Sequence, residues 1–195
     1  MADFESFLDT QGELDAVNDI LGAIGEAPVN SLEASSSDVA NARRILASIN
    51  RTVQAKGWTF NIEESATIMP DSQTRQIPYL QSYLRVMGAG GQGQYINRMG
   101  YVFDRTGNTD EFDGPIQVDL VRLRDFYEMP VCFRDLIVCK ASRQFNRNFY
   151  GQQEIEASLA EQERDFMITC NEYEMDYGRY NMLDGDAFTG GLLSR

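Results

Sequence analysis

Acidic side chains are the most abundant groups in this sequence that could perform chemistry. The chain has 195 residues, with 30 Asp and Glu, 17 Lys and Arg, and no histidine. Catalytic triads that depend on histidine are therefore excluded, and paired carboxylates, which cleave glycosidic bonds, remain as the catalytic alternative. The candidates lie on or near a predicted sheet: Glu63, Glu64, Asp104, Asp110, Glu111 and Asp113. In so acidic a chain such pairs arise by chance, so we predict no catalytic residue and keep a polysaccharide hydrolase as the alternative function.

A glycine-rich segment matches the spacing of a dinucleotide-binding motif. Gly88, Gly90 and Gly93 fit the pattern GxGxxG, but that site requires a helix directly after the glycines to hold the pyrophosphate. Residues 95–103 are instead typical of strand, turn and strand. We therefore interpret the segment as a plain loop and predict no cofactor.

The three cysteines, Cys132, Cys139 and Cys170, lie in apolar helical segments. In the absence of histidine their spacing matches no zinc site, so we predict no metal. The odd number and the buried setting favour reduced thiols in a protein that is made and assembled in a cytosol.

Net charge limits the partners of this chain. Its formal charge is −13, whereas a free nucleic-acid-binding surface is expected to be basic. The chain begins without a signal peptide pattern, and no apolar run approaches the ~20 residues of a membrane span. We expect neither sequence-specific binding of DNA nor a membrane partner.

Two long helical patterns, which meet at Tyr150-Gly151, organise residues 129–177. The first is apolar around much of its circumference, and Lys140, Arg143 and Arg147 share one of its faces. The second carries an apolar repeat and many acids. We predict a helical hairpin in which the three cations contact acids such as Glu161, Glu163 and Asp165, either within the hairpin or across a contact with a neighbouring copy.

Two amphipathic helices are predicted in residues 10–57, after a flexible arm at 1–9. Apolar residues recur at helical spacing in both, and Ser36, Ser37 or Asp38 can cap the second. Arg43, Arg44 and Arg51 lie off its apolar stripe, and we interpret them as a solvated face.

Residues 58–128 change from helical to alternating patterns. Strands are predicted near 58–62 and 116–120, and a hairpin that turns at 98–100 is predicted in 95–103, while 77–86 fits either a short helix or an extended segment. The sequence therefore predicts an α+β, mainly α fold. An antiparallel helical bundle (10–57 and 129–177) holds an inserted β-rich region (58–128) with a small antiparallel sheet, and an extended arm follows at 178–195.

Aromatic residues are numerous around the predicted sheet, and glycine and aromatic residues alternate in the last segment. Core packing explains several of them, but the surplus also suits a protein–protein surface, where Tyr and Phe act as anchors. We interpret Tyr95, Tyr101 and Phe103 as candidate contacts on the sheet. Candidate anchors in the arm are Tyr180, Met182, Leu183 and Phe188.

Several long, irregular segments resemble one family. They are AVNDILGAIGEAPV (16–29), NARRILASINR (41–51), GWTFNIEE (57–64), YINRMGYVFDRT (95–106), VRLRDFYEMPVCFRDLIVCKASRQFNRNFYG (121–151) and EYEMDYGRYNMLDGDAF (172–188). Together they are similar to tail tubular protein A, the head-to-tail adaptor (gatekeeper) of short-tailed podovirus bacteriophages. The similarity runs over most of the chain, with the weakest match in the first thirteen residues.

The resemblance implies a structural protein of the virion tail. Family members form a dodecameric ring between the portal protein and the tail nozzle (tubular protein B), help to retain and channel DNA, and provide a platform for nozzle and tail fibres. On this basis we expect the hairpin charges to contribute to the subunit interface. We also expect Tyr95, Tyr101 and Phe103 to face the nozzle, and the arm at 178–195 to dock on the portal.

Overall fold

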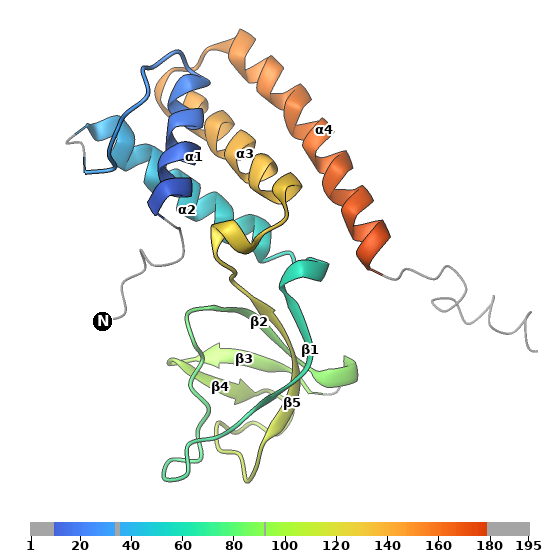
Figure 1. Ribbon diagram of the computed structural model, residues 1–195. Helices are drawn as coiled ribbons and strands as arrows, with labels where there is room; N and C mark the ends of the chain where they lie inside the picture. The colour runs from blue at the N-terminus through green and yellow to red at the C-terminus, as the bar shows by residue number, and fades with distance from the viewer. Residues whose placement is uncertain (1–9, 34–35, 92, 179–195) are drawn as a thin grey trace, which may run out of the picture.

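Two groups of elements, one helical and one of strands, make up the computed structural model, which describes residues 10–33, 36–91 and 93–178. Figure 1 shows the chain leaving the helical lobe after its second helix, forming the strands, and returning to complete the helical lobe. Each lobe has a hydrophobic core of its own. The mainly helical α+β architecture predicted from the sequence is confirmed.

Four helices form the helical lobe: α1 (Thr10–Gly22), α2 (Ser37–Gln54), α3 (Val131–Phe149) and α4 (Gln153–Tyr177). The predicted cap of α2 is present, because the backbone N–H of Asp38 donates to the Ser36 hydroxyl. Helix α3 is central and contacts each of the other three helices. Its fully buried side chains are Phe133, Leu136, Ile137, Ala141 and Phe145.

The strand lobe contains a three-stranded antiparallel sheet and a separate hairpin. The sheet has the order β1 (Ile62–Ile68), β5 (Ile116–Arg122), β2 (Tyr83–Gly88), with β5 in the centre. The hairpin consists of β3 (Tyr95–Arg98) and β4 (Tyr101–Asp104), and it turns at Met99-Gly100 as the sequence predicts. Alternation along β5 buries Val118 and Leu120 in the core of this lobe.

Two local predictions change in the structure. The alternating residues 58–62 do not form a strand, because Thr59–Asn61 is a short 3-10 helix and β1 begins only at Ile62. The Asn61 side chain accepts a hydrogen bond from the backbone N–H of Trp58 at 2.8 Å, which closes this turn. The ambiguous segment 77–86 forms no helix: a turn at Gln81-Ser82 precedes β2, which begins at Tyr83.

None of the helices in the described ranges combines the length and the apolar character that a membrane crossing requires. The predicted arms at 1–9 and 179–195 lie outside the described residues. The four candidate anchors of the second arm, Tyr180, Met182, Leu183 and Phe188, therefore have no described position.

Candidate functional site

Ion pairs join α3 to α4 along one side of the helical hairpin. Lys140 Nζ lies 2.5 Å from Glu163 Oε1, and Arg143 Nη1 lies 2.9 Å from Glu163 Oε2. Arg143 Nε also contacts Glu156 Oε1 at 2.7 Å, and Arg147 Nη2 contacts the same oxygen at 2.5 Å. Two carboxylates therefore bind three cations, and the basic stripe of α3 is used within the chain.

Hydrogen bonds shift the pKa values of this network toward the charged forms. Burial opposes ionisation of Glu163, but the hydrogen bonds from Lys140 and Arg143 outweigh it and hold the pKa of this carboxyl below its ordinary value of 4.5. The pKa of Glu156 is lowered in the same way, by Arg147 and Arg143 against burial. Hydrogen bonds to Glu163 and Glu156 raise the pKa of Arg143. The Glu163 and Glu156 carboxylates and the Arg143 guanidinium are therefore charged at neutral pH.

Replacing Glu163 by glutamine tests the network. Because the folded-state pKa of Glu163 is lowered, its contribution to stability is present above pH 4.5 and is lost as the pH falls through the folded-state pKa. We expect Glu163→Gln to lower the free energy of unfolding by about 1–2 kcal/mol at pH 7, since the side chain is 18% exposed. The difference from wild type should become smaller as the pH is lowered below 4.5, as measured by urea unfolding at pH 7 and pH 3.

The matched control is Glu161→Gln, on the exposed face of the same helix. It removes one charge without removing an ion pair, so its stability should follow the wild-type curve at both pH values. Equal stability of wild type and Glu163→Gln at pH 7 would contradict a stabilising role for the network.

The cysteines are buried or half-buried free thiols on the same two helices. Cys139 donates to the backbone carbonyl of Leu159 on α4 at 3.4 Å, and burial raises its pKa to about 11. Burial likewise raises the pKa of Cys170, to about 12, and its thiol is hydrogen-bonded to Cys132 across the two helices. Thiols in this state are poor nucleophiles at neutral pH, and their contacts contribute to the packing of the hairpin.

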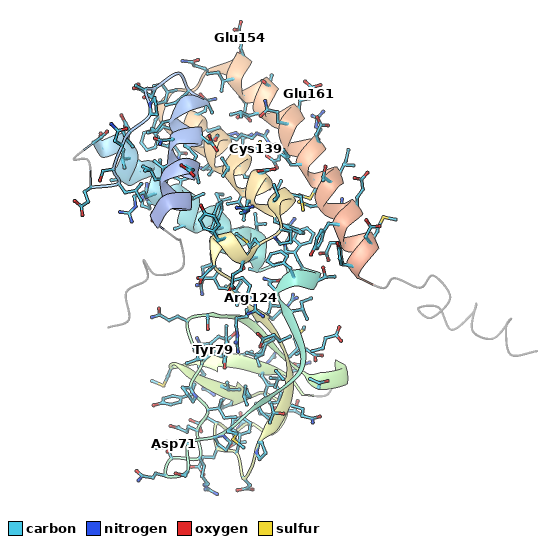
Figure 2. The ribbon with its side chains drawn as sticks, in the orientation of Figure 1. Asp71, Tyr79, Arg124, Cys139, Glu154 and Glu161 are labelled. Carbon is cyan, nitrogen blue, oxygen red and sulfur yellow. The ribbon has the colours of Figure 1, made fainter. Side chains whose placement is uncertain are left out.

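A polar junction connects the helical lobe to the strand lobe. The buried Gln54 side chain, at the end of α2, donates to the backbone carbonyl of Arg124 at 3.0 Å and accepts from its N–H at 2.8 Å. Figure 2 shows Arg124 at the boundary of the two lobes. From α4, the Glu174 carboxylate accepts hydrogen bonds from the N–H and the hydroxyl of Thr59. Both connections between the lobes are thus fixed by side chains of the helical lobe.

The β3–β4 hairpin presents apolar side chains to solvent. Met99, at its tip, is 94% exposed, and Ile96 and Tyr101 are also exposed. Phe103 is half-buried beneath the Arg98 guanidinium, 4.5 Å from the ring centroid. These neighbouring side chains form a small apolar and aromatic surface on the β3–β4 hairpin, whose turn lies at one side of the strand lobe (Figure 1).

Comparison with known proteins identifies the family. A family model described as tail tubular protein matches residues 14–180, which is most of the chain. The chain belongs to the tail tubular protein family. It is similar to tail tubular protein A of Klebsiella phage KP34, with 31% identity over 118 residues, 60% of this chain and 62% of that relative. The matched part thus spans less than two thirds of the relative's length. Membership makes this chain a structural component of a phage tail.

In this family member only one of the three acids predicted to contact the basic stripe of α3 forms ion pairs with it. Glu163 binds the basic stripe as expected, but Glu161 and Asp165 are exposed and form no ion pair with any described residue. The second partner is Glu156, which the sequence analysis did not select. In Figure 2, Glu154 and Glu161 lie on the outer edge of α4. The contribution of Glu161 and Asp165 to a subunit interface stays a prediction.

The sequence contained a signal for the correct partner. In an antiparallel hairpin, residues at equal distances from the turn lie beside each other. Lys140 and Glu163 are 11 and 12 residues from Gly151, and Arg147 and Glu156 are 4 and 5 residues from it. Counting outward from the turn would have added Glu156 as a partner of Arg147, but it does not exclude Glu161, which is 10 residues from Gly151 and so matches Lys140 as closely as Glu163 does.

The carboxylates considered for glycan hydrolysis have structural partners in this tail tubular protein. Five of the six have hydrogen-bond or ion-pair partners, and the sixth, Glu64, is exposed on β1. The partners are Arg122 and Arg124 for Glu63, Arg75 for Glu111 and Asp113, Gln76 for Asp110, and the backbone N–H of Thr106 for Asp104. Among the described residues, no group of acids and cysteines has an arrangement suited to a metal ion.

The three sheet aromatics predicted to form a contact have different environments. Tyr95 packs against Phe112 in the core of the strand lobe, with ring centroids 6.2 Å apart, whereas Tyr101 is exposed and Phe103 half-buried. Sequence reasoning missed Met99, because a methionine in a predicted turn gives no signal of its exposure.

Proposed function

We propose that this tail tubular protein forms a closed dodecameric ring between the portal protein and the tail nozzle, tubular protein B. The observation that carries the proposal is the division into two lobes with separate cores and different exposed surfaces. The helical lobe exposes an acidic face of α4, and the strand lobe exposes the apolar end of the β3–β4 hairpin. A ring subunit between two partners needs separate surfaces for its neighbours and for each end.

The charge of the chain supports a ring that channels DNA without recognising its sequence. A formal charge of −13 disfavours an extended basic surface that would hold phosphates. DNA can then pass during ejection without being held in place, and retention of packaged DNA relies on closure of the channel.

The two ends of the ring are assigned to different partners. The β3–β4 surface with Tyr101 and Phe103, supported from beneath by Tyr95, faces the nozzle, because exposed aromatic and methionine side chains are suited to protein contacts. Residues 178–195 dock on the portal, and tail fibres attach to the outside of the assembled ring.

The test is assembly with the purified portal and nozzle proteins of the same phage, followed by light scattering and electron microscopy. We expect a closed ring that caps the portal. Deleting residues 178–195 should abolish portal binding and leave nozzle binding intact. Met99→Asn should do the reverse, and asparagine tolerates the positive φ of 54° at that position.

A wild-type chain that stays monomeric in the presence of the portal would contradict the ring. Retention of both contacts in both variants would leave the ring in place but contradict the assignment of its ends.

A further inference from the structure

The outer face of α4 carries a regular stripe of exposed side chains. Glu161, Asp165, Ile168, Glu172 and Met175 recur at spacings of four, three, four and three, which places them on one side of the helix. All five are exposed, and Ile168 and Met175 have 56% and 71% of their surface accessible. We call these five residues the α4 stripe. Two exposed apolar residues two turns apart, flanked by acids, are typical of a helix that docks into a groove.

The acids of the α4 stripe differ from the other acids of the same helix. Glu156, Glu163 and Glu174 face the rest of the protein and bind α3 or the lobe junction. The stripe acids Glu161 and Glu172, by contrast, have no cationic partner among the described residues, and the same holds for Asp165. The fold therefore neutralises one side of α4 and leaves the opposite side mainly negative, with Arg164 as the single cation of this helix beside the stripe.

A groove of complementary character lies between α2 and α3. It has a volume of about 420 Å³. Its lining combines apolar, polar and cationic side chains: Arg44, Ile45, Ser48, Ile49, Gln144 and Asn148. None of these is acidic, and Arg44 is an exposed cation with no ion pair to a described residue. Its neighbour Arg43, in contrast, binds the buried carboxylate of Glu13 at 2.6 Å. We call these six residues the α2–α3 groove.

The two surfaces lie on different sides of the helical lobe. Figure 1 shows α3 between α4 at one edge and α1 and α2 at the other. One subunit therefore cannot dock its own α4 stripe into its own α2–α3 groove. A contact between two different surfaces of identical chains is heterologous, and repetition of such a contact produces a ring when the rotation closes.

We propose that the α4 stripe of one subunit docks into the α2–α3 groove of its neighbour. Ile168 packs over Ile45 and Ile49, while Arg44 pairs with Glu161 or Asp165. This inference rests on the proposed ring and names the surfaces that build it. It also replaces the hairpin cations as the basic side of the subunit contact, since Lys140, Arg143 and Arg147 already bind Glu156 and Glu163.

A charge exchange between two separately purified variants tests the contact. The first is Arg44→Glu, and the second combines Glu161→Arg with Asp165→Arg. All three positions are exposed or lie on the helix surface, so both variants should melt at the wild-type temperature. Each variant alone places like charges across every contact, and we expect ring formation on the portal to weaken by about tenfold or more. Mixed in equal amounts, they should form rings again, because each of the two alternating contacts is then complementary.

The matched control is Arg105→Glu, the same charge reversal at an exposed arginine after β4. It should form rings like the wild type. Rings that persist in both single variants, or that fail to return in the mixture, would overturn the docking of these two surfaces while leaving the ring itself in place. A wild-type chain that forms no ring would overturn the ring and the docking together. Open filaments with the same charge dependence would support the docking and contradict only closure.

Discussion

Replacing Phe133 by alanine is expected to lower the free energy of unfolding by about 3–5 kcal/mol, a large part of the ~5–15 kcal/mol that stabilises a folded domain. Phe133 is fully buried in α3. Its ring lies 4.8 Å from Trp58, 4.7 Å from Phe60 and 5.7 Å from Tyr173. The truncation leaves a cavity where α3, α4 and the connection to the strand lobe meet. Because Trp58 is the single tryptophan of the chain, its fluorescence during urea unfolding reports directly on this site.

Val131→Ala is the control for this truncation, since Val131 is in the same helix and 60% exposed. It should change the free energy of unfolding by less than about 0.5 kcal/mol. A loss below about 1 kcal/mol in Phe133→Ala would show that the three aromatic neighbours close the cavity, and that this cluster does not hold the lobe together.

The helical part of the fold was predictable because its signals are local. Apolar residues at helical spacing define α1 to α4. Ser36 caps α2 by accepting a hydrogen bond from the N–H of Asp38, only two residues further along the chain. The β3–β4 hairpin was predictable for the same reason, since its turn at Met99-Gly100 joins adjacent strands. Patterns of this kind depend only on residues that are close together in the sequence, so they can be recognised without knowledge of the tertiary structure.

The errors concern contacts between distant segments. Residues 58–62 alternate as a strand does, yet Thr59 is held in a 3-10 turn by Glu174, 115 residues away, and by the packing of Trp58 and Phe60 on Phe133. Tertiary contacts of this kind override a weak local pattern. The order of the sheet also required knowledge of distant pairing, because β5 lies between β1 and β2.

The candidate site divides along the same line. Sequence reasoning identified the basic stripe of α3 and the acidic helix α4. It did not separate the acids that form ion pairs within the hairpin from the acids that remain exposed and could contact a neighbouring subunit. This distinction depends on the register of α3 against α4, which places Glu156 and Glu163 inward and Glu161 and Asp165 outward. A subunit contact is therefore better sought among charged side chains that form no ion pair within the subunit than among the charged stripes that stand out in the sequence.

Replacing Gln54 by leucine is expected to lower the free energy of unfolding by about 3 kcal/mol although the side chain keeps its size. The Gln54 amide satisfies the N–H and the carbonyl of Arg124 and also donates to Asn50 at 2.9 Å, and it is fully buried. Leucine removes the partner of one buried group, the Asn50 side-chain oxygen, and of two partly buried groups, the N–H and the carbonyl of Arg124. A buried polar group without a partner costs about 1–3 kcal/mol, and the cost is lower where water can enter. The measurement is urea unfolding combined with hydrogen exchange of the Arg124 amide, which should exchange much faster in the variant.

Two further variants separate the hydrogen bonds from the packing. Gln81→Leu makes the same substitution at an exposed position and should leave stability within about 0.5 kcal/mol of wild type. Gln54→Glu keeps an acceptor for the Arg124 N–H but loses the donor to its carbonyl, so its stability should recover as the pH falls and the carboxyl gains a proton. If Gln54→Leu unfolds at the same urea concentration as wild type, the connection between the lobes depends on apolar packing. In that case the Gln54 amide does not set how the helical lobe and the strand lobe are held to each other.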